Sequence, residues 1–398
     1  MSVTAAAGFR AAGISAGLKE SGKRDLALVV NDGPLDVAVG VFTTNRVVAA
    51  PVRWCREVLS GRRGPANRAR AVILNSGSAN ACTGPRGAAD TAATAARVAE
   101  LLADSRPGTA ADSVLVCSTG VIGVPLDMPN LLDGAATAVA SLQDGPEAGH
   151  DAATAIMTTD TVSKEEALHL DGWSIGGMIK GVGMLAPGMA TMLCVITTDA
   201  VVDADAAQSA LSRAAARTVN RINSDGCMST NDTVLLLASG ASGRVPVADE
   251  FDAAVQELLG RLGRRLVADA EGATHDIAIT VTGAVTEAAA EAAARTVSAS
   301  NLLKCAVAGE DPNWGRVISQ LGTVPEAVCP FDPDAVDVAI NGVTIYAHGA
   351  LGADRSTVDM TPRETRIDIA LNAGAAAATV WTNDLTHGYV TINADYTT

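Results

Sequence analysis

Aromatic and charged side chains are scarce in this sequence. Of the 398 residues, 3% are aromatic and 18% are charged, whereas 48% are hydrophobic. This composition excludes a mainly disordered protein and requires a core built from Ala, Val, Leu and Ile. The chain is too long for one simple core, so two or three closely packed subdomains are expected.

Paired cysteines are lacking. The seven cysteines are scattered, odd in number and form no Cys-x-x-Cys pair: Cys55, Cys82, Cys117, Cys194, Cys227, Cys305 and Cys329. This pattern argues against a disulfide framework or a zinc cluster and indicates a reducing compartment. The N-terminus does not resemble a signal peptide, and no run reaches the roughly 18–20 apolar residues that span a bilayer. We therefore expect a soluble, cytoplasmic protein with no membrane partner.

Positive charge is in deficit. The chain has 29 Lys and Arg against 44 Asp and Glu, which gives a formal net charge of −15. A field of this sign repels nucleic acids and anionic membranes, so neither is an expected partner. It also repels anionic metabolites, so a substrate that carries a carboxylate needs a local cation in the site.

The hydrophobic patterns alternate between strands and helices. Strand-like runs occupy residues 25–30, 36–43, 71–75, 113–117, 173–178, 191–198, 233–238 and 275–285, with a hairpin in 336–346 around Asn341-Gly342. Helical spacing occupies residues 88–103, 129–142, 151–157, 203–222 and 251–270. Residues 379–398 are predicted to be rich in strand, and Asp311–Arg316 is interpreted as a turn that enters a helix with Trp314 packed beneath it. The alternation predicts layers of an α/β fold.

The usual catalytic groups are nearly absent. The five histidines are isolated, so no histidine-built metal site is expected, and no Gly-x-Ser-x-Gly elbow is present. The glycines of residues 176–183 match neither the phosphate-binding loop nor the dinucleotide fingerprint. A nucleophile must therefore be activated without histidine. A threonine at a chain's own N-terminus meets this need, because its α-amine can act as the base.

Thr191 fits this requirement if the peptide bond before it is broken. Ala190 is small and leaves its carbonyl open to attack, and Thr191 begins a run of β-formers. From the pattern alone, an ordinary strand threonine remains the favoured alternative.

Several motifs, in order along the chain, resemble those of the bifunctional glutamate N-acetyltransferase/ornithine acetyltransferase family of arginine biosynthesis. The segment Lys180–Leu193 resembles the self-cleavage segment of that family. The other matching segments are residues 40–45, 75–81, 118–123, 156–161, 310–316 and 393–398. Ser78 departs from the Asn expected there, and this departure affects none of the named roles.

The resemblance implies roles for individual residues. Thr191 would be the nucleophile and, through its freed amine, the base, while Thr119 and Gly120 would form the oxyanion hole. The implied substrate-binding residues are Thr158, Lys180, Thr191, Glu271, Asn393 and Thr398. Without the resemblance, the segment 118–120 is equally a polar turn, Lys180 a solvated loop lysine and Glu271 a surface residue at a helix end.

The resemblance also implies a fold and an activity. Cleavage between Ala190 and Thr191 would give an α chain (1–190) and a β chain (191–398) in a layered α/β sandwich resembling the N-terminal-nucleophile hydrolases. The enzyme would transfer an acetyl group from N-acetylornithine to glutamate by a ping-pong mechanism, with no metal or prosthetic group. The cleaved αβ units would assemble into an oligomer.

Four alternatives remain open at this point. Acetyl-CoA could serve as a second acetyl donor, which the sequence does not decide. A related hydrolase or aminopeptidase would pass the acyl group to water, and a specialised paralogue would pass it to another acceptor. A non-catalytic binding protein would keep its chain intact.

Overall fold

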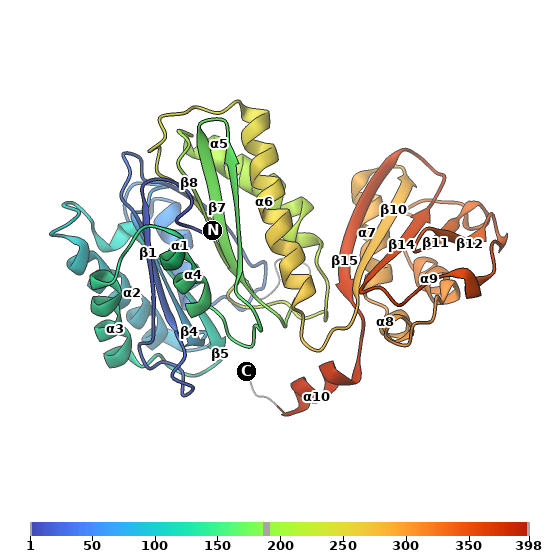
Figure 1. The fold of residues 1–398 in the computed structure, drawn as a ribbon, viewed down its shortest axis with the longest axis horizontal. Coiled ribbons are helices and arrows are strands. Elements are labelled where there is room, and N and C mark those ends of the chain that lie inside the picture. The colour runs from blue at the N-terminus through green and yellow to red at the C-terminus, as the bar shows by residue number, and fades with distance from the viewer. Residues whose placement is uncertain (1, 186–191, 396–398) are drawn as a thin grey trace.

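The computed structural model describes residues 2–185 and 192–395. Its first part is a sandwich in which two β-sheets lie against each other and helices cover their outer faces (Figure 1). The first sheet has the order β1-β2-β4-β5, with β1 at Phe9–Ile14, β2 at Leu26–Asn31, β4 at Ala71–Ser78 and β5 at Val114–Val121.

Helices cover the first sheet. They are α1 (Ala50–Leu59), α2 (Gly84–Leu102) and α3 (Met128–Ala140), while α4 (Pro146–Ala155) packs on β1 and β2 and reaches the second sheet. All four carry a proline in the first two helical positions. Proline suits that place because its fixed φ is helical and its missing N–H would have no partner there.

The second sheet lies against the first and completes the sandwich. Its order is β3-β9-β8-β7-β6, with β3 at Val37–Phe42, β9 at Thr233–Ala238, β8 at Leu193–Thr198, β7 at Trp173–Lys180 and β6 at Lys164–Leu170. Its outer face is covered by α5 (Ala204–Arg217) and α6 (Ala248–Ala268). Along β8, Leu193 and Val195 pack in the core with the first sheet, and Cys194 and Ile196 pack in the core with these helices. The alternation of strand side chains therefore fills two cores at once.

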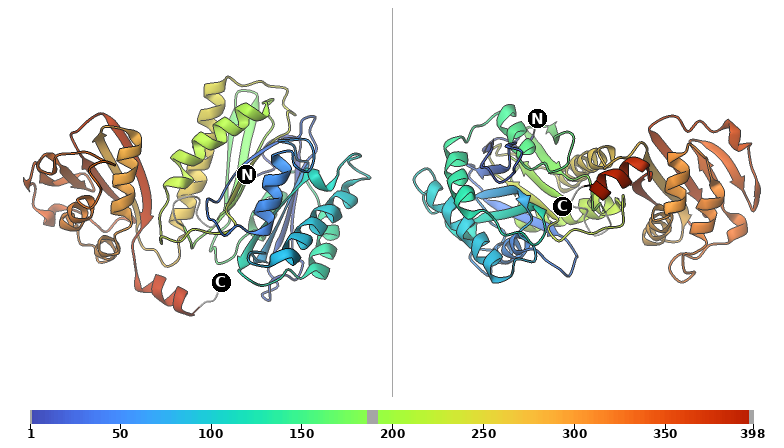
Figure 2. Two further views of the ribbon diagram at one scale, coloured as in Figure 1. Left: turned by 180° about the vertical axis from the view of Figure 1, so that it is seen from behind. Right: turned by 90° about the horizontal axis from the view of Figure 1, so that it is seen from below.

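A third body follows α6 and has its own hydrophobic core (Figure 2). Its sheet has the order β13-β12-β11-β14-β10-β15. The strands are β10 (Asp276–Ala284), β11 (Asp337–Ile340), β12 (Val343–Ala347), β13 (Ala350–Leu351), β14 (Glu364–Ala370) and β15 (Ala376–Asn383), and the helices are α7 (Glu287–Ser298), α8 (Asn301–Ala308) and α9 (Trp314–Leu321). Trp381 of β15 joins this body to the second sheet's layer, because its carbonyl accepts from the Asn223 N–H at 2.9 Å.

Most of the predicted elements are present. The described residues pack into three large cores and one small one, in agreement with the expected two or three subdomains. The α/β layering is confirmed. The hairpin turns at Asn341 and Gly342, with φ of 46° and 83°, and α9 begins at Trp314, whose ring stacks on Tyr346 at 4.8 Å. The predicted helix 203–222 is shorter, because α5 ends at Arg217 and a 3-10 turn follows.

The prediction for the C-terminal segment was wrong after Asn383. Strand β15 ends there, and α10 (His387–Asp395) follows in place of further strand. The side chains of residues 389–392 favour strand by propensity. The Thr386 hydroxyl instead accepts the Tyr389 N–H at 3.1 Å and so begins a helix. Among the described residues, no helix combines the length and apolar character needed to cross a bilayer.

Candidate active site

The end of the second sheet brings the candidate residues together. Lys180, the last residue of β7, pairs with Leu193, the first residue of β8, and Leu193 pairs with Thr233, the first residue of β9. The segment after β7 and the segments before β8 and β9 therefore meet at the same end of the sheet. The predicted nucleophile precedes β8 in the chain.

Lys180 is the centre of this cluster. Its side chain is buried, with 2% of the residue exposed, and its Nζ donates to Thr158 Oγ1 at 2.8 Å and to Thr119 Oγ1 at 3.2 Å. Burial lowers the pKa of Lys180, and the nearby Asp160 carboxylate opposes that shift. The structure thus brings together three of the predicted residues, and Lys180 is no solvated loop lysine.

Close packing of two strand ends positions Thr119 and Gly120. In β5, Gly120 has a φ of 128° and lies against Gly77 of β4 in an irregular part of the ladder. A Cβ on Gly120 would stand 2.3 Å from the Gly77 carbonyl carbon, so only glycine fits. The Ser118 hydroxyl donates to Asn75 Oδ1 at 2.6 Å and fixes the strand just before Thr119.

A buried ion cluster lies next to Lys180, because the Thr158 hydroxyl that accepts from Lys180 also donates to Asp160 Oδ2 at 3.4 Å. Lys164 donates to Asp160 Oδ1 at 2.6 Å and to Asp269 Oδ2 at 2.5 Å, and the Gly181 N–H donates to Asp160 Oδ1 at 2.8 Å. Burial alone would raise the pKa of Asp160, but the charges of Lys180 and Lys164 outweigh it and lower that pKa to about 2. Asp160 therefore stays negatively charged beside Lys180.

Glu271 and Asn393 join the cluster through Thr159, the residue after Thr158. The Thr159 hydroxyl donates to Glu271 Oε1 at 2.9 Å, and the Asn393 amide donates to Glu271 Oε2 at 3.1 Å. Helix α10 supplies Asn393 by reaching back from the third body (Figure 1). Glu271 is also tied to the chain after Lys180, since its N–H donates to the Val182 carbonyl at 3.1 Å.

Three predicted residues lie outside the described residues: Ala190, Thr191 and Thr398. Met192, the first described residue after that gap, donates its N–H to Asp232 Oδ1 at 3.0 Å. Cleavage at 190–191 and the function of Thr398 therefore stay predictions.

Sequence reasoning missed several polar residues of the site. Asp160, Lys164, Asn231 and Asp232 are buried around it, and the Asn231 amide donates to the carbonyls of Ala79 at 2.6 Å and Ser118 at 2.8 Å. The signal for two of them was present. The run Ser229–Thr233 is polar throughout and directly precedes a strand of apolar residues, a pattern typical of functional loops at sheet edges.

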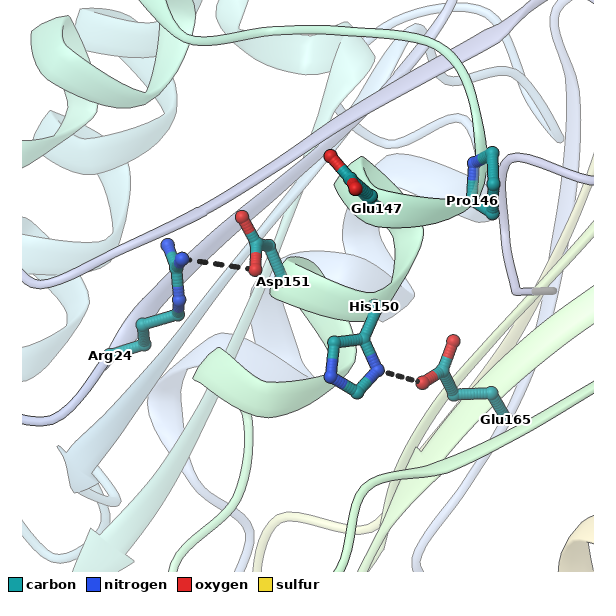
Figure 3. Close-up of a pocket in the computed structure, with 6 residues that line it drawn as sticks. All are labelled: Arg24, Pro146, Glu147, His150, Asp151 and Glu165. Carbon is teal, nitrogen blue, oxygen red and sulfur yellow. Dashed lines mark hydrogen bonds and ion pairs between the residues drawn. The ribbon is translucent and has the colours of Figure 1, made fainter.

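An open surface pocket lies apart from this cluster (Figure 3). It contains two ion pairs, His150 with Glu165 at 2.6 Å and Arg24 with Asp151 at 3.0 Å. These groups satisfy one another, and none of them bonds to Lys180. Among the described residues, no three His, Cys, Asp or Glu side chains are grouped to hold a metal ion.

A family model and curated relatives match nearly the whole chain. The model of the ArgJ family matches residues 10–398. The chain is 59% identical to the arginine biosynthesis bifunctional protein ArgJ of Bifidobacterium longum and 55% identical to that of Streptomyces coelicolor, each match covering 100% of both chains. A crystal structure of the ornithine acetyltransferase of Mycobacterium tuberculosis with ornithine is 56% identical, covers 48% of this chain and 96% of that chain, and has a TM-score of 0.45.

Proposed function

The chain belongs to the ArgJ family, and from this premise we propose that it transfers an acetyl group from N-acetylornithine to glutamate through Thr191. The activity would produce ornithine and N-acetylglutamate in arginine biosynthesis. It requires cleavage of the chain before Thr191, because only then does this residue carry a free amine.

One observation carries the proposal: Lys180 is buried between two threonine hydroxyls at the end of the sheet where β8 begins. In the described part of the chain, no carboxylate lies within ion-pair distance of its Nζ, so its charge is available to a ligand. In a protein with a net charge of −15, such a lysine is the local cation that a carboxylate substrate needs.

Thr119 is suited to stabilise the oxyanion. Its Oγ1 accepts from Lys180 at 3.2 Å, so its own proton stays available to a substrate oxygen. The N–H of the neighbouring Gly120 would be the second donor. In acyl transfer, the loss of one such donor typically costs about 2.7–4 kcal/mol of transition-state stabilisation.

The proposed turnover has two halves. The Thr191 hydroxyl attacks the acetyl carbonyl of N-acetylornithine, its proton passes to the α-amine of Thr191, and the amine of ornithine leaves with that proton. The glutamate amine then attacks the acetyl ester and restores the Thr191 hydroxyl. Ornithine leaves before glutamate reacts at the same site, so the kinetics are ping-pong.

The charges of the site suit amino-acid substrates. Lys180 and Thr158 would bind a carboxylate, while Glu271 would bind an ammonium with the help of Asn393 and Thr398. Lys180 is bonded to Thr158 and Glu271 to the adjacent Thr159, so the site offers both signs of charge, as an amino acid needs. Acetyl-CoA is a second donor to be tested against N-acetylornithine.

The proposal extends to assembly and location. Cleaved protomers would form an oligomer of αβ units, as the family resemblance implies. The seven cysteines are all free, which supports a reducing, cytoplasmic setting.

The cleavage is tested by denaturing electrophoresis with N-terminal sequencing. We expect two chains of about 20 kDa each, one of which begins at Thr191, since cleavage would divide the 40.2 kDa chain near its middle. Thr191→Ala should leave the chain whole and lower activity by at least about 1,000-fold. Thr198→Ala, at the opposite end of β8, is the matched control and should be cleaved. A single wild-type band near 40 kDa contradicts the proposal.

The acceptor is tested separately. Incubation with N-acetylornithine and glutamate should form N-acetylglutamate and ornithine in equal amounts. Release of free acetate at the same rate without glutamate would identify a hydrolase. Acetyl-CoA replaces N-acetylornithine in a parallel assay and decides whether it is a donor.

A further inference from the structure

The first chain cleavage needs a proton acceptor that Thr191 itself cannot supply. Until the bond after Ala190 breaks, the nitrogen of Thr191 is an amide nitrogen, which does not accept protons at neutral pH. The hydroxyl must nevertheless lose its proton to attack. Some other group must therefore accept that proton during the cleavage.

Asp232 is a buried carboxyl with a free oxygen at the right place in the chain. The residue is 0% exposed, and its Oδ1 accepts the Met192 N–H at 3.0 Å. Its Oδ2 is fully buried and has no hydrogen-bond partner within residues 2–185 and 192–395. An unsatisfied buried carboxylate oxygen is costly, so its presence calls for a function.

Covalent geometry connects this carboxyl to Thr191. Met192 directly follows Thr191 in the chain. The Met192 nitrogen is the atom that Asp232 binds. Asp232 is therefore hydrogen-bonded to the residue next to the predicted nucleophile.

The position of Asp232 is fixed from three sides. It directly precedes Thr233, which pairs with Leu193 in the parallel ladder of β9 and β8. Its carbonyl accepts the Thr43 N–H at 2.9 Å. The preceding Asn231 binds the carbonyls of Ala79 and Ser118 and so ties the segment to the end of β5. A proton acceptor held in this way is pre-organised.

The surroundings of Asp232 suit proton transfer at neutral pH. Burial raises the pKa of Asp232 well above its usual range. The hydrogen bond from the Met192 N–H at 3.0 Å and the charge of Lys180 on β7 oppose that shift. A carboxyl whose pKa moves toward the working pH both accepts and returns a proton effectively.

We propose that Asp232 is the proton acceptor for the cleavage of the chain before Thr191, an inference that rests on the proposed function. The Thr191 hydroxyl gives its proton to Asp232 Oδ2 and its oxygen bonds to the Ala190 carbonyl carbon. The bond from that carbon to the Thr191 nitrogen then breaks, and the nitrogen takes the proton back from Asp232. Water hydrolyses the resulting ester and leaves the Ala190 carboxylate and the restored hydroxyl.

The test compares Asp232→Asn with the wild-type chain, both made by cell-free synthesis and followed by denaturing electrophoresis. The asparagine keeps an oxygen for the Met192 N–H but cannot accept a proton, so we expect cleavage to slow by at least about 100-fold. Asp199→Asn is the matched control: Asp199 is a buried carboxyl at the opposite end of β8 that accepts two backbone N–H groups, from Ser174 at 2.7 Å and Ala7 at 2.9 Å. It should be cleaved at the wild-type rate.

A rescue experiment separates proton transfer from a structural role. Asp232→Gly removes the carboxyl. Added formate should restore cleavage, and as the pH is varied the rate should follow the concentration of the formate anion. Circular dichroism confirms that the variant is folded. Wild-type cleavage in Asp232→Asn, or no rescue by formate in folded Asp232→Gly, overturns the proposal. A wild-type chain that stays whole would instead overturn the proposed function itself.

Discussion

Two lysines on neighbouring strands are equally buried but differ in their partners. Lys164 begins β6, and Lys180 ends β7 one position from the residue with which Lys164 pairs. Lys164 contacts two carboxylates, at 2.5 and 2.6 Å, whereas Lys180 contacts two hydroxyls. The protein neutralises the first charge itself and leaves the second for a ligand. Burial alone thus does not distinguish a structural lysine from a binding one, but the count of carboxylate partners does.

The largest expected effect comes from Lys164→Met. It leaves the buried Asp160 and Asp269 without their shared cation, and breaking a buried ion pair in this way costs about 3–5 kcal/mol. The free energy of unfolding from urea denaturation measures it. Arg261→Met, which removes an exposed pair with Glu257, is the control and should change stability by less than about 1 kcal/mol. Equal losses in the two variants would contradict the structural role of Lys164.

Lys180→Met should have the opposite profile. Losing the charge that meets the substrate carboxylate should lower kcat/KM by roughly 10–100-fold, while urea stability stays within about 1 kcal/mol. The pKa of Lys180 is lowered in the folded protein, so its charge opposes folding at neutral pH. That cost fades as pH rises past the folded pKa and is gone above the unfolded value of about 10.4. A variant that is fully active but unstable would reverse the two assignments.

Acid should weaken the ion cluster of Lys164, Asp160 and Asp269. The pKa of Asp160 is about 2 in the folded chain, against an ordinary aspartate value of 3.8. Its stabilisation is therefore present above pH 4 and is lost as pH falls toward 2, by about 2 kcal/mol. Urea titrations at pH 6, 4 and 3 of wild type and Asp160→Asn measure this. The difference in the free energy of unfolding between the two proteins should shrink as the pH falls. A constant difference would show that the charge of Asp160 contributes nothing.

The smallest effect is a shift in the titration of Lys19. Burial lowers its pKa to about 8, and the charge of Lys180 contributes to that shift. Acylation of Lys19 with a limiting amine reagent, followed by mass spectrometry, should show a midpoint near pH 8, below that of a lysine in a short peptide. In Lys180→Met the midpoint should move upward. An unchanged midpoint would mean that Lys180 carries no charge in the free protein.

The motifs in the sequence were enough to find Thr119, Thr158 and Lys180, which the structure brings into contact. They could not reveal the role of Lys164, because its partner Asp269 lies 105 residues away. Strand β6 was also missed. It is an edge strand with the sequence Lys-Glu-Glu-Ala-Leu-His-Leu, and the charges that protect an edge hide the apolar alternation.

Helix α10 shows a different limit of sequence reasoning. Its residues Tyr389 to Ile392 favour a strand, and only the Thr386 cap and the absence of a neighbouring strand among the described residues decide for a helix. Asn393 was found by motif alone. Its contact with Glu271 depends on a chain reversal that no local pattern predicts.

The strand order of the second sheet has a consequence for the processed enzyme. Cleavage at residue 190 would place β8 and β9 on one polypeptide, and β3, β7 and β6 on the other. In the order β3-β9-β8-β7-β6, β9 and β8 lie between β3 and β7. Strand β9 is hydrogen-bonded to β3, and β8 is hydrogen-bonded to β7, so each pairing would join the two polypeptides. Neither fragment could leave without opening the sheet. The processed protein would be an obligate heterodimer from the moment it is cut, and recovery from denaturant would become bimolecular and slow on dilution, while the uncut chain would refold at a rate independent of its concentration.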